Sequence, residues 1–257
     1  MPDNAIELWL VDLDACAPAL AEIERDAPRL SPEDRQRADA LADPRDAARR
    51  RAAYTALRLA IERLAGPAVR AQPFTRDTNG KPELPDSSVA FSLAHTDDLA
   101  LIGVTRLATI GVDLEKIRPI RMSPRHIADL CAAGAGLGRE PLPGGNTERT
   151  FLQAWARIEA FTKARGHTLQ RTLADLGLRN RPDRPPSPTE TRSTARRLAR
   201  TAGLHVMDIK LPRDLHGAFA APRALLTARV RTFPSDHADL RDQIEREQPR
   251  YNRADHP

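Results

Sequence analysis

Residues 151–166 read Phe-Leu-Gln-Ala-Trp-Ala-Arg-Ile-Glu-Ala-Phe-Thr-Lys-Ala-Arg-Gly, and this stretch is among the most informative in the chain. Its apolar residues Phe151, Trp155 and Ile158 recur at helical spacing, which predicts an amphipathic helix with these side chains on its buried stripe. Glu159 and Lys163 lie four residues apart, so we expect them one turn apart at the border of that stripe. The terminal glycine signals the end of the helix. Alone, the Glu159–Lys163 pair is explained equally well as an ordinary exposed ion pair.

A second run, Gly111-Val112-Asp113-Leu114-Glu115, precedes the helix and alternates apolar with acidic residues. A period of two predicts a strand in which Asp113 and Glu115 point to the same face. Two carboxylates so close repel each other unless a positive charge lies between them, and a divalent cation such as Mg²⁺ meets that need. The alternative is a solvated strand face neutralised by Lys116 and Arg118.

Together with blocks upstream, the two runs resemble a known family. Gly-Val-Asp-Leu-Glu-Lys-Ile-Arg-Pro (111–119) and Trp-Ala-Arg-Ile-Glu-Ala-Phe-Thr-Lys (155–163) are similar to the two signatures of the 4′-phosphopantetheinyl transferases. The upstream blocks are similar to further family motifs and keep the family's order; they are Leu30-Ser31-Pro32-Glu33 with the basic stretch 49–59, Asn79-Gly80-Lys81-Pro82-Glu83-Leu84, and Phe91-Ser92-Leu93-Ala94-His95-Thr96. The chain's length resembles that of the long, surfactin-synthetase-activating class.

The resemblance implies transfer of the 4′-phosphopantetheine group of coenzyme A to a serine of an apo acyl or peptidyl carrier protein, with release of 3′,5′-ADP. It implies that Asp113, Glu115 and Glu159 hold Mg²⁺ or Mn²⁺, which also binds the pyrophosphate of coenzyme A. Glu159, or a water that it holds, would deprotonate the carrier serine. Lys163 would contact the phosphate oxygens and stabilise the leaving group.

The same resemblance implies further contacts around coenzyme A. His95 would hydrogen-bond a phosphate, although a histidine in a turn is also explained without a ligand. Lys81 and Pro82 would lie beside the adenine and ribose. Arg49 or Arg50 would bind the 3′-phosphate, because a guanidinium suits a phosphate dianion, and the sequence leaves the register between these two arginines open.

Four positions depart from the family's pattern, and one of them is Thr168, which stands where the family usually has a second glycine after Lys163. Ile158 stands where the family has a lysine that helps to bind the pyrophosphate, and Arg157 lies about 100° away around the helix. Ser92 and Ala94 replace an asparagine and a serine near His95. The metal residues are all kept, so we expect an intact metal site and weaker coenzyme A binding. A catalytically impaired family member that binds coenzyme A or a carrier protein is the alternative hypothesis.

The implied fold is α+β, with two similar subdomains related by a pseudo-two-fold axis, each a small antiparallel sheet packed by helices. We expect an N-terminal subdomain at residues 1–107, on the 3′-phosphate and adenine side, and a C-terminal subdomain at 108–233 with the metal and catalytic motifs. A Pro/Arg-rich insertion at about 180–200 and a Gly/Pro stretch at 134–146 are expected to be loops. Residues 234–257 are expected to form a polar tail.

Composition limits the partners. The 257 residues carry a net charge of +5, which suits an anionic partner such as coenzyme A with an acidic carrier protein. A basic, metal-dependent nucleic-acid-binding protein is the third hypothesis, but aromatic residues make up only 4% of the chain, too few for base-stacking repeats. The chain has neither a signal-peptide pattern nor an apolar run near the ~20 residues that span a membrane. We therefore expect a cytoplasmic protein without nucleic-acid or membrane partners. The family resemblance further implies a monomer that serves secondary metabolite biosynthesis.

Overall fold

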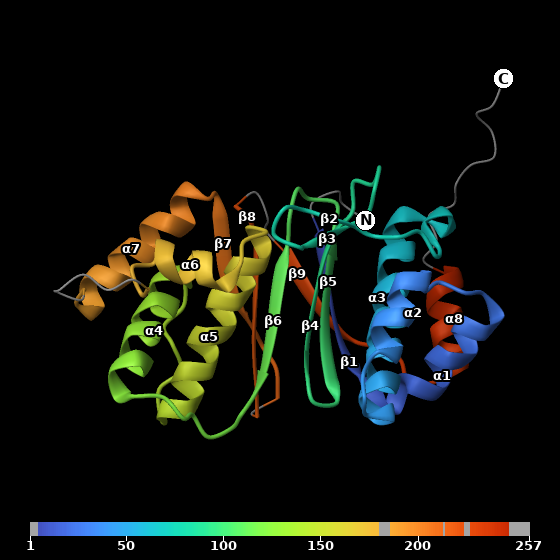
Figure 1. The fold of residues 1–257 in the computed structure, drawn as a ribbon, viewed down its shortest axis with the longest axis horizontal. Coiled ribbons are helices and arrows are strands. Elements are labelled where there is room, and N and C mark those ends of the chain that lie inside the picture. Colours follow the sequence, from blue (N-terminus) through green and yellow to red (C-terminus); the bar gives the residue numbers. More distant parts are fainter. Residues whose placement is uncertain (1–4, 180–185, 213, 224–226, 247–257) are drawn as a thin grey trace.

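Two β-sheets face each other, and helices cover the outer face of each (Figure 1). The structure is a computed structural model that describes residues 5–179, 186–212, 214–223 and 227–246. The first sheet has the strand order β4-β5-β1-β9, with strands β1 (Ala5–Asp12), β4 (Ala90–Thr96), β5 (Leu99–Thr105) and β9 (Thr227–Thr232). On its outer side lie helices α1 (Leu13–Asp26), α2 (Pro32–Asp39), α3 (Pro44–Ala65) and α8 (His237–Arg246) (Figure 1).

The second sheet has the strand order β6-β8-β7, with strands β6 (Gly111–Lys116), β7 (Leu204–Ile209) and β8 (Leu215–Pro222). Its helices are α4 (Pro124–Leu137), α5 (Thr147–Ala164), α6 (Leu169–Asp175) and α7 (Pro188–Thr201) (Figure 1). A short 3₁₀ helix, η1 (Pro67–Val69), and a two-stranded hairpin of β2 (Thr75–Arg76) and β3 (Pro82–Glu83) lie between α3 and β4 along the chain.

This arrangement confirms the predicted α+β fold with small antiparallel sheets. All ladders between the described strands are antiparallel except that of β9 with β1, which is parallel. The division into subdomains at 1–107 and 108–233 stays a prediction, and β9, from the end of the second range, returns to the first sheet. Among the described helices, none combines the length and the apolarity needed to cross a bilayer.

A shared core holds the two sheets together. Ile6 and Leu8 of β1 belong to the same buried cluster as Val112 and Leu114 of β6. Burying an aliphatic side chain of this size stabilises a fold by about 1.5–3 kcal/mol, so this cluster fixes one sheet against the other. Because alternate residues of a strand point to opposite faces, Asp113 lies on the other face of β6, toward α5.

The prediction of a loop at about 180–200 is wrong for the second part of this range, which forms helix α7. Ser187 opens this helix with a capping box, in which Ser187 and Glu190 each accept a hydrogen bond from the other's backbone. Thr191, Ala195 and Ala199 follow at steps of four and are buried, so a stripe of small side chains packs α7 on the molecule. Residues 180–185 lie outside the described residues.

The loop expected at 134–146 also begins later than predicted, because α4 continues to Leu137. Two glycines in its last turns let other helices approach closely. A Cβ on Gly134 would lie 2.5 Å from the Cα of Ala154 in α5, and one on Gly136 would lie 2.3 Å from the carbonyl oxygen of Arg192 in α7. The glycines therefore serve helix packing here rather than a loop.

The predicted polar tail begins with an ordered helix. Helix α8 packs against α1, and Leu240 joins Phe233 in the core cluster of the first sheet. The rest of the tail, residues 247–257, lies outside the described part of the chain.

Candidate active site

A cavity of about 500 Å³ lies where the β2–β3 hairpin, α2, α3 and β4 meet β6 and the end of α5. Its basic lining side chains are Arg37, Arg50, Arg76, Lys81, His95, Lys163 and His167, while its acidic ones are Asp34 and Asp113. The cavity wall is therefore predominantly cationic, which suits an anionic ligand with several phosphates.

The cavity brings together six of the nine site residues predicted from sequence. Those that line it are Arg50, Lys81, Pro82, His95, Asp113 and Lys163, contributed by both sides of the molecule. Glu115 and Glu159 are half-buried and belong to the same elements, β6 and α5, but do not line the cavity. Arg49 also lies outside the lining.

The two neighbouring arginines of α3 have different surroundings. Arg49 donates from Nε and a terminal nitrogen to the carboxylate of Asp14 in α1, at 2.7 and 2.6 Å. Arg50 lines the cavity, with its guanidinium 5.7 Å from the ring centre of Tyr54. Of the two arginines between which the sequence does not choose, Arg50 is the one that lines the cavity.

One face of helix α5 is partly exposed to solvent. Trp155, Glu159 and Lys163, each four residues after the last, are partly exposed, whereas Phe151 and Ile158 are fully buried. Trp155 was expected on the buried stripe with these two residues; it packs against the same cluster but is only partly buried. Its ring stacks on Phe151 at 6.1 Å and so covers the core from the edge. The burial of α5 follows the two elements that it packs on, β6 and β8, which a single helix sequence does not reveal.

The lysine of α5 pairs with the strand rather than with its own helix. Lys163 Nζ donates to Asp113 Oδ1 at 2.7 Å, and the Asp113 side chain is 9% exposed. Glu115 instead pairs with Arg118, as the solvated-face alternative expects for this carboxylate. Within the described residues, Glu159 forms no hydrogen bond or ion pair, so its carboxylate is the one that stays available.

The three carboxylates share an electrostatic environment that disfavours their charge. Burial raises the pKa of Asp113, Glu115 and Glu159, and the negative charge of Asp113 raises the pKa of the other two further. Lys163 opposes this and lowers the pKa of all three. The negative charge at this end of α5 is therefore only partly compensated by protein cations.

A divalent cation would suit this donor set. The second oxygen of Asp113, Oδ2, is buried and has no hydrogen-bond partner, which is unusual for a carboxylate and suits a missing ligand. Oxygen donors are what Mg²⁺ prefers. Yet no three His, Cys, Asp or Glu side chains in the described ranges are grouped so that they could hold a metal ion as they stand. The chemistry of the donors fits, but the arrangement is not a preformed metal site.

His95 and Lys81 are both partly withdrawn from water. Loss of hydration, followed by the charge of Arg50, lowers the pKa of His95, and Lys163 lowers it further. Burial lowers the pKa of Lys81. An anion bound among these groups would offset the mutual repulsion of Arg50, His95 and Lys163.

Among the departures from the family's pattern, Ile158 lies in the core, whereas Ser92 and Ala94 line the cavity. Ile158 is 0% exposed and belongs to the cluster between α5 and the second sheet. Arg157 is also 0% exposed and makes a two-pronged ion pair with Asp208, both nitrogens at 2.6 Å. Arg157 therefore does not replace the family lysine, as predicted. The Ser92 hydroxyl accepts a hydrogen bond from the Val112 backbone N–H at 3.1 Å and so links β4 to β6.

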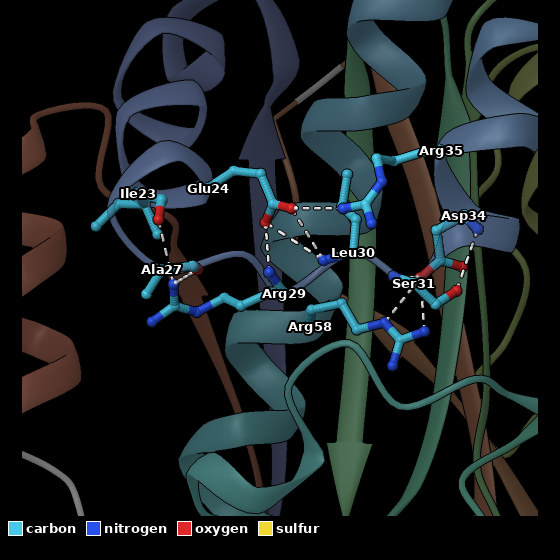
Figure 2. Close-up of polar contacts among 9 residues, drawn as sticks. All are labelled: Ile23, Glu24, Ala27, Arg29, Leu30, Ser31, Asp34, Arg35 and Arg58. Atoms are coloured by element: carbon cyan, nitrogen blue, oxygen red, sulfur yellow. Dashed lines mark hydrogen bonds and ion pairs between the residues drawn. The ribbon is translucent and has the colours of Figure 1, made fainter.

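The sequence argument missed several residues that line the cavity, among them Arg37 and Phe74. Their positions depend on a buried network of hydrogen bonds and ion pairs. Figure 2 shows Arg58 of α3 donating to Asp34 of α2, at 2.9 and 2.6 Å, while Ser31 caps α2 through Asp34. Arg58 also lies 3.6 Å from the ring centre of Phe74, which lines the cavity. This network holds α2, and with it Arg37, at the cavity. The sequence signal for this region was the block Leu30-Ser31-Pro32-Glu33 with the basic stretch 49–59, which did not reveal the network.

Comparison with known proteins gives two relatives. No protein-family model matches the chain. The chain is 31% identical to the 4′-phosphopantetheinyl transferase HetI of Nostoc sp. over 178 residues, which cover 63% of this chain and 69% of HetI. It is 32% identical over 144 residues to a protein of Synechocystis sp. that is provisionally named a 4′-phosphopantetheinyl transferase, and this match spans 53% of the chain and 57% of that protein's length.

Proposed function

The chain belongs to the 4′-phosphopantetheinyl transferase family, and from this premise we propose that it moves the 4′-phosphopantetheine group of coenzyme A to a serine of an apo acyl or peptidyl carrier protein, releasing 3′,5′-ADP. The observation that carries the proposal is the cationic cavity in which Arg50, His95 and Lys163 converge beside Asp113. Coenzyme A has phosphates at both ends of its nucleotide, and a cavity lined by spaced cations suits that charge distribution.

The first sheet's side of the cavity would bind the nucleotide. Arg50 suits the 3′-phosphate, because a guanidinium can donate two parallel hydrogen bonds to a dianion. His95 would donate to another phosphate oxygen. The stem of Lys81 and the ring of Pro82 would lie beside the adenine and ribose.

The second sheet's side would carry the chemistry. Asp113, Glu115 and Glu159 would hold Mg²⁺ or Mn²⁺, and the bound ion would supply Lewis-acid stabilisation of the charge on the phosphate under attack. Glu159 would accept the proton of the carrier serine, directly or through a water that it holds; because a carboxylate that ligates a metal is a weak base, the water would suit this step better. Lys163 would stabilise the negative charge of the departing 3′,5′-ADP.

The finer parts of the proposal rest on the family resemblance. They are membership of the long, surfactin-synthetase-activating class, a monomeric state, a cytoplasmic location, and a carrier protein of secondary metabolite biosynthesis. The division at residues 107 and 108 would then separate the nucleotide-binding side from the metal-binding side.

The test is a mass measurement on the carrier. The protein is incubated with coenzyme A, Mg²⁺ and several apo carrier proteins, and the carrier is expected to gain one phosphopantetheine group. Coenzyme A binding without any gain in mass would favour the impaired family member. Nucleic-acid binding without coenzyme A binding would favour the third hypothesis.

A variant on α5 then tests the site. Glu159→Ala is expected to abolish transfer. Glu148→Ala is the matched control, because Glu148 lies on the same helix about 16 Å toward its N-terminus. An unchanged rate for Glu159→Ala would show that the assigned site is wrong.

A further inference from the structure

We infer that Lys81 is a positioning residue, whose ammonium holds the last turn of α5 rather than a phosphate of the ligand. Lys81 Nζ donates to the hydroxyl oxygen of Thr109 at 2.9 Å and to the carbonyl oxygen of Ile110 at 3.4 Å. Both acceptors lie in the segment that joins β5 to β6. The ammonium is therefore directed at the chain between the two sheets.

The contact continues into α5. The Thr109 hydroxyl, having accepted from Lys81, donates to the carbonyl oxygen of Ala164 at 2.6 Å. Ala164 is the last residue of α5, where backbone carbonyls have no partner within the helix. Thr109 thus satisfies an orphan acceptor, and the ammonium behind it lies near the negative end of the helix dipole, where a cation is favourable.

Two close approaches support the same turn of α5. A Cβ on Gly111 would lie 2.1 Å from the carbonyl oxygen of Ala160, so β6 meets the helix backbone directly. On the other side, a Cβ on Gly166 would lie 2.6 Å from Asp77 Oδ2 and 3.7 Å from the Cδ of Lys81. The hairpin turn that carries Lys81 therefore lies against Gly166, two residues after the end of α5.

The hairpin turn is itself organised for this contact. The other oxygen of Asp77, Oδ1, accepts the backbone N–H groups of Asn79 and Lys81 at 2.8 and 2.9 Å. This fixes the backbone from which the Lys81 stem starts. One carboxylate therefore shapes the turn and also lies beside Gly166, just after α5.

The position of the last turn matters for the site, because Lys163 belongs to it and Glu159 lies one turn earlier. The 2.7 Å contact between Lys163 and Asp113 requires α5 to keep its place along β6. The Lys81–Thr109–Ala164 chain supplies that restraint from the first sheet's side. The consequence for transfer rests on the proposed function, while the restraint itself does not.

The restraint is tested by amide hydrogen exchange in four proteins: the unmodified chain, Lys81→Met, Thr109→Val and the double variant. Met keeps the apolar stem and Val keeps the shape, so only the hydrogen-bonding groups are lost. Each single variant is expected to speed exchange of the amides of residues 165–167 roughly tenfold, and the double variant no further, because both substitutions break one chain of bonds. Lys210→Met, an exposed lysine after β7, is the control for lost charge and should leave this exchange unchanged.

Unchanged exchange in Lys81→Met, or effects that multiply in the double variant, would overturn the inference. Because no ligand is present, this result is independent of whether the protein transfers phosphopantetheine. If transfer is found, Lys81→Met and Thr109→Val should lower kcat by a similar factor and leave KM for coenzyme A within about twofold. A raised KM in Lys81→Met alone would mean that the ammonium binds the ligand.

Discussion

Restoring the family lysine at position 158 is the sharpest test of how the site departs from its relatives. The sequence alone suggests that Ile158→Lys should tighten coenzyme A binding by returning a cation to the pyrophosphate. The structure reverses this expectation, because Ile158 is 0% exposed and packs within the cluster behind α5. A lysine there would start from the core and not from the cavity.

The magnitude follows from burial. Removing a fully buried isoleucine forfeits about 1.5–3 kcal/mol of hydrophobic stabilisation. Leaving an unpartnered polar group in its place costs roughly another 1–3 kcal/mol, and a charged group costs more. Burial would also lower the pKa of a lysine at this position. The total of about 3–6 kcal/mol is a large share of the ~5–15 kcal/mol that holds a typical domain folded. For a chain of this size it corresponds to a fall in Tm of roughly 6–24 °C.

The assay is thermal and urea unfolding of Ile158→Lys beside Ile158→Met, followed by calorimetric titration with coenzyme A at a temperature where both are folded. Met conserves volume and should cost less than about 1.5 kcal/mol, so it separates lost packing from the buried charge. If Ile158→Lys is as stable as Ile158→Met and binds coenzyme A more tightly, then position 158 can face the ligand and the burial argument is refuted.

Three further variants test the site and its support. Arg50→Ala should weaken coenzyme A binding about 10–100-fold, since a charged hydrogen bond is worth about 1.5–3 kcal/mol. Arg49→Ala should change binding by less than about twofold, because Arg49 already pairs with Asp14. Equal effects of the two variants would contradict the assignment of the 3′-phosphate contact to Arg50. Burial and the Asp113 charge raise the pKa of Glu159 above 4.5, so the metal-free protein should lose stability as the pH rises from that ordinary value through the raised one. Glu159→Gln should flatten this fall and raise Tm at neutral pH without metal, and a lower Tm there would count against the interpretation. Gly111→Ala should cost at least 1–3 kcal/mol, or prevent folding, because its Cβ would meet the Ala160 carbonyl at 2.1 Å, while Gly144→Ala, with open space around it, should stay within about 0.5 kcal/mol in urea titrations.

Local patterns predicted the parts of the site that depend on one element. Alternation along β6 correctly predicted that Asp113 faces away from the apolar core, because period two is a property of the strand itself. The spacing of Glu159 and Lys163 likewise predicted their shared face of α5. Similarity between sequence blocks then brought Lys81 and His95 to the same cavity as Asp113, which spacing alone would not have done.

What failed depends on contacts between elements. The sequence left the choice between Arg49 and Arg50 open, and their different surroundings come from Asp14, which lies on another helix. The partial exposure of Trp155, on a stripe where Phe151 and Ile158 are buried as predicted, is decided by where β6 and β8 contact α5. No periodicity within one helix contains that information, since a helix can turn about its own axis without changing its sequence pattern.

The parallel pairing of β9 with β1 has a consequence for the order in which the molecule is made. The two strands are more than two hundred residues apart along the chain, yet Ala5 pairs with Thr227. Emerging from the ribosome at about 5–20 residues per second, the first strand would wait roughly ten to forty-five seconds for its neighbour. During that interval one long edge of β1 has no partner strand, and such an edge is a template for pairing with other chains. Synthesis speed and chaperone access would then decide how much of this protein reaches its native state.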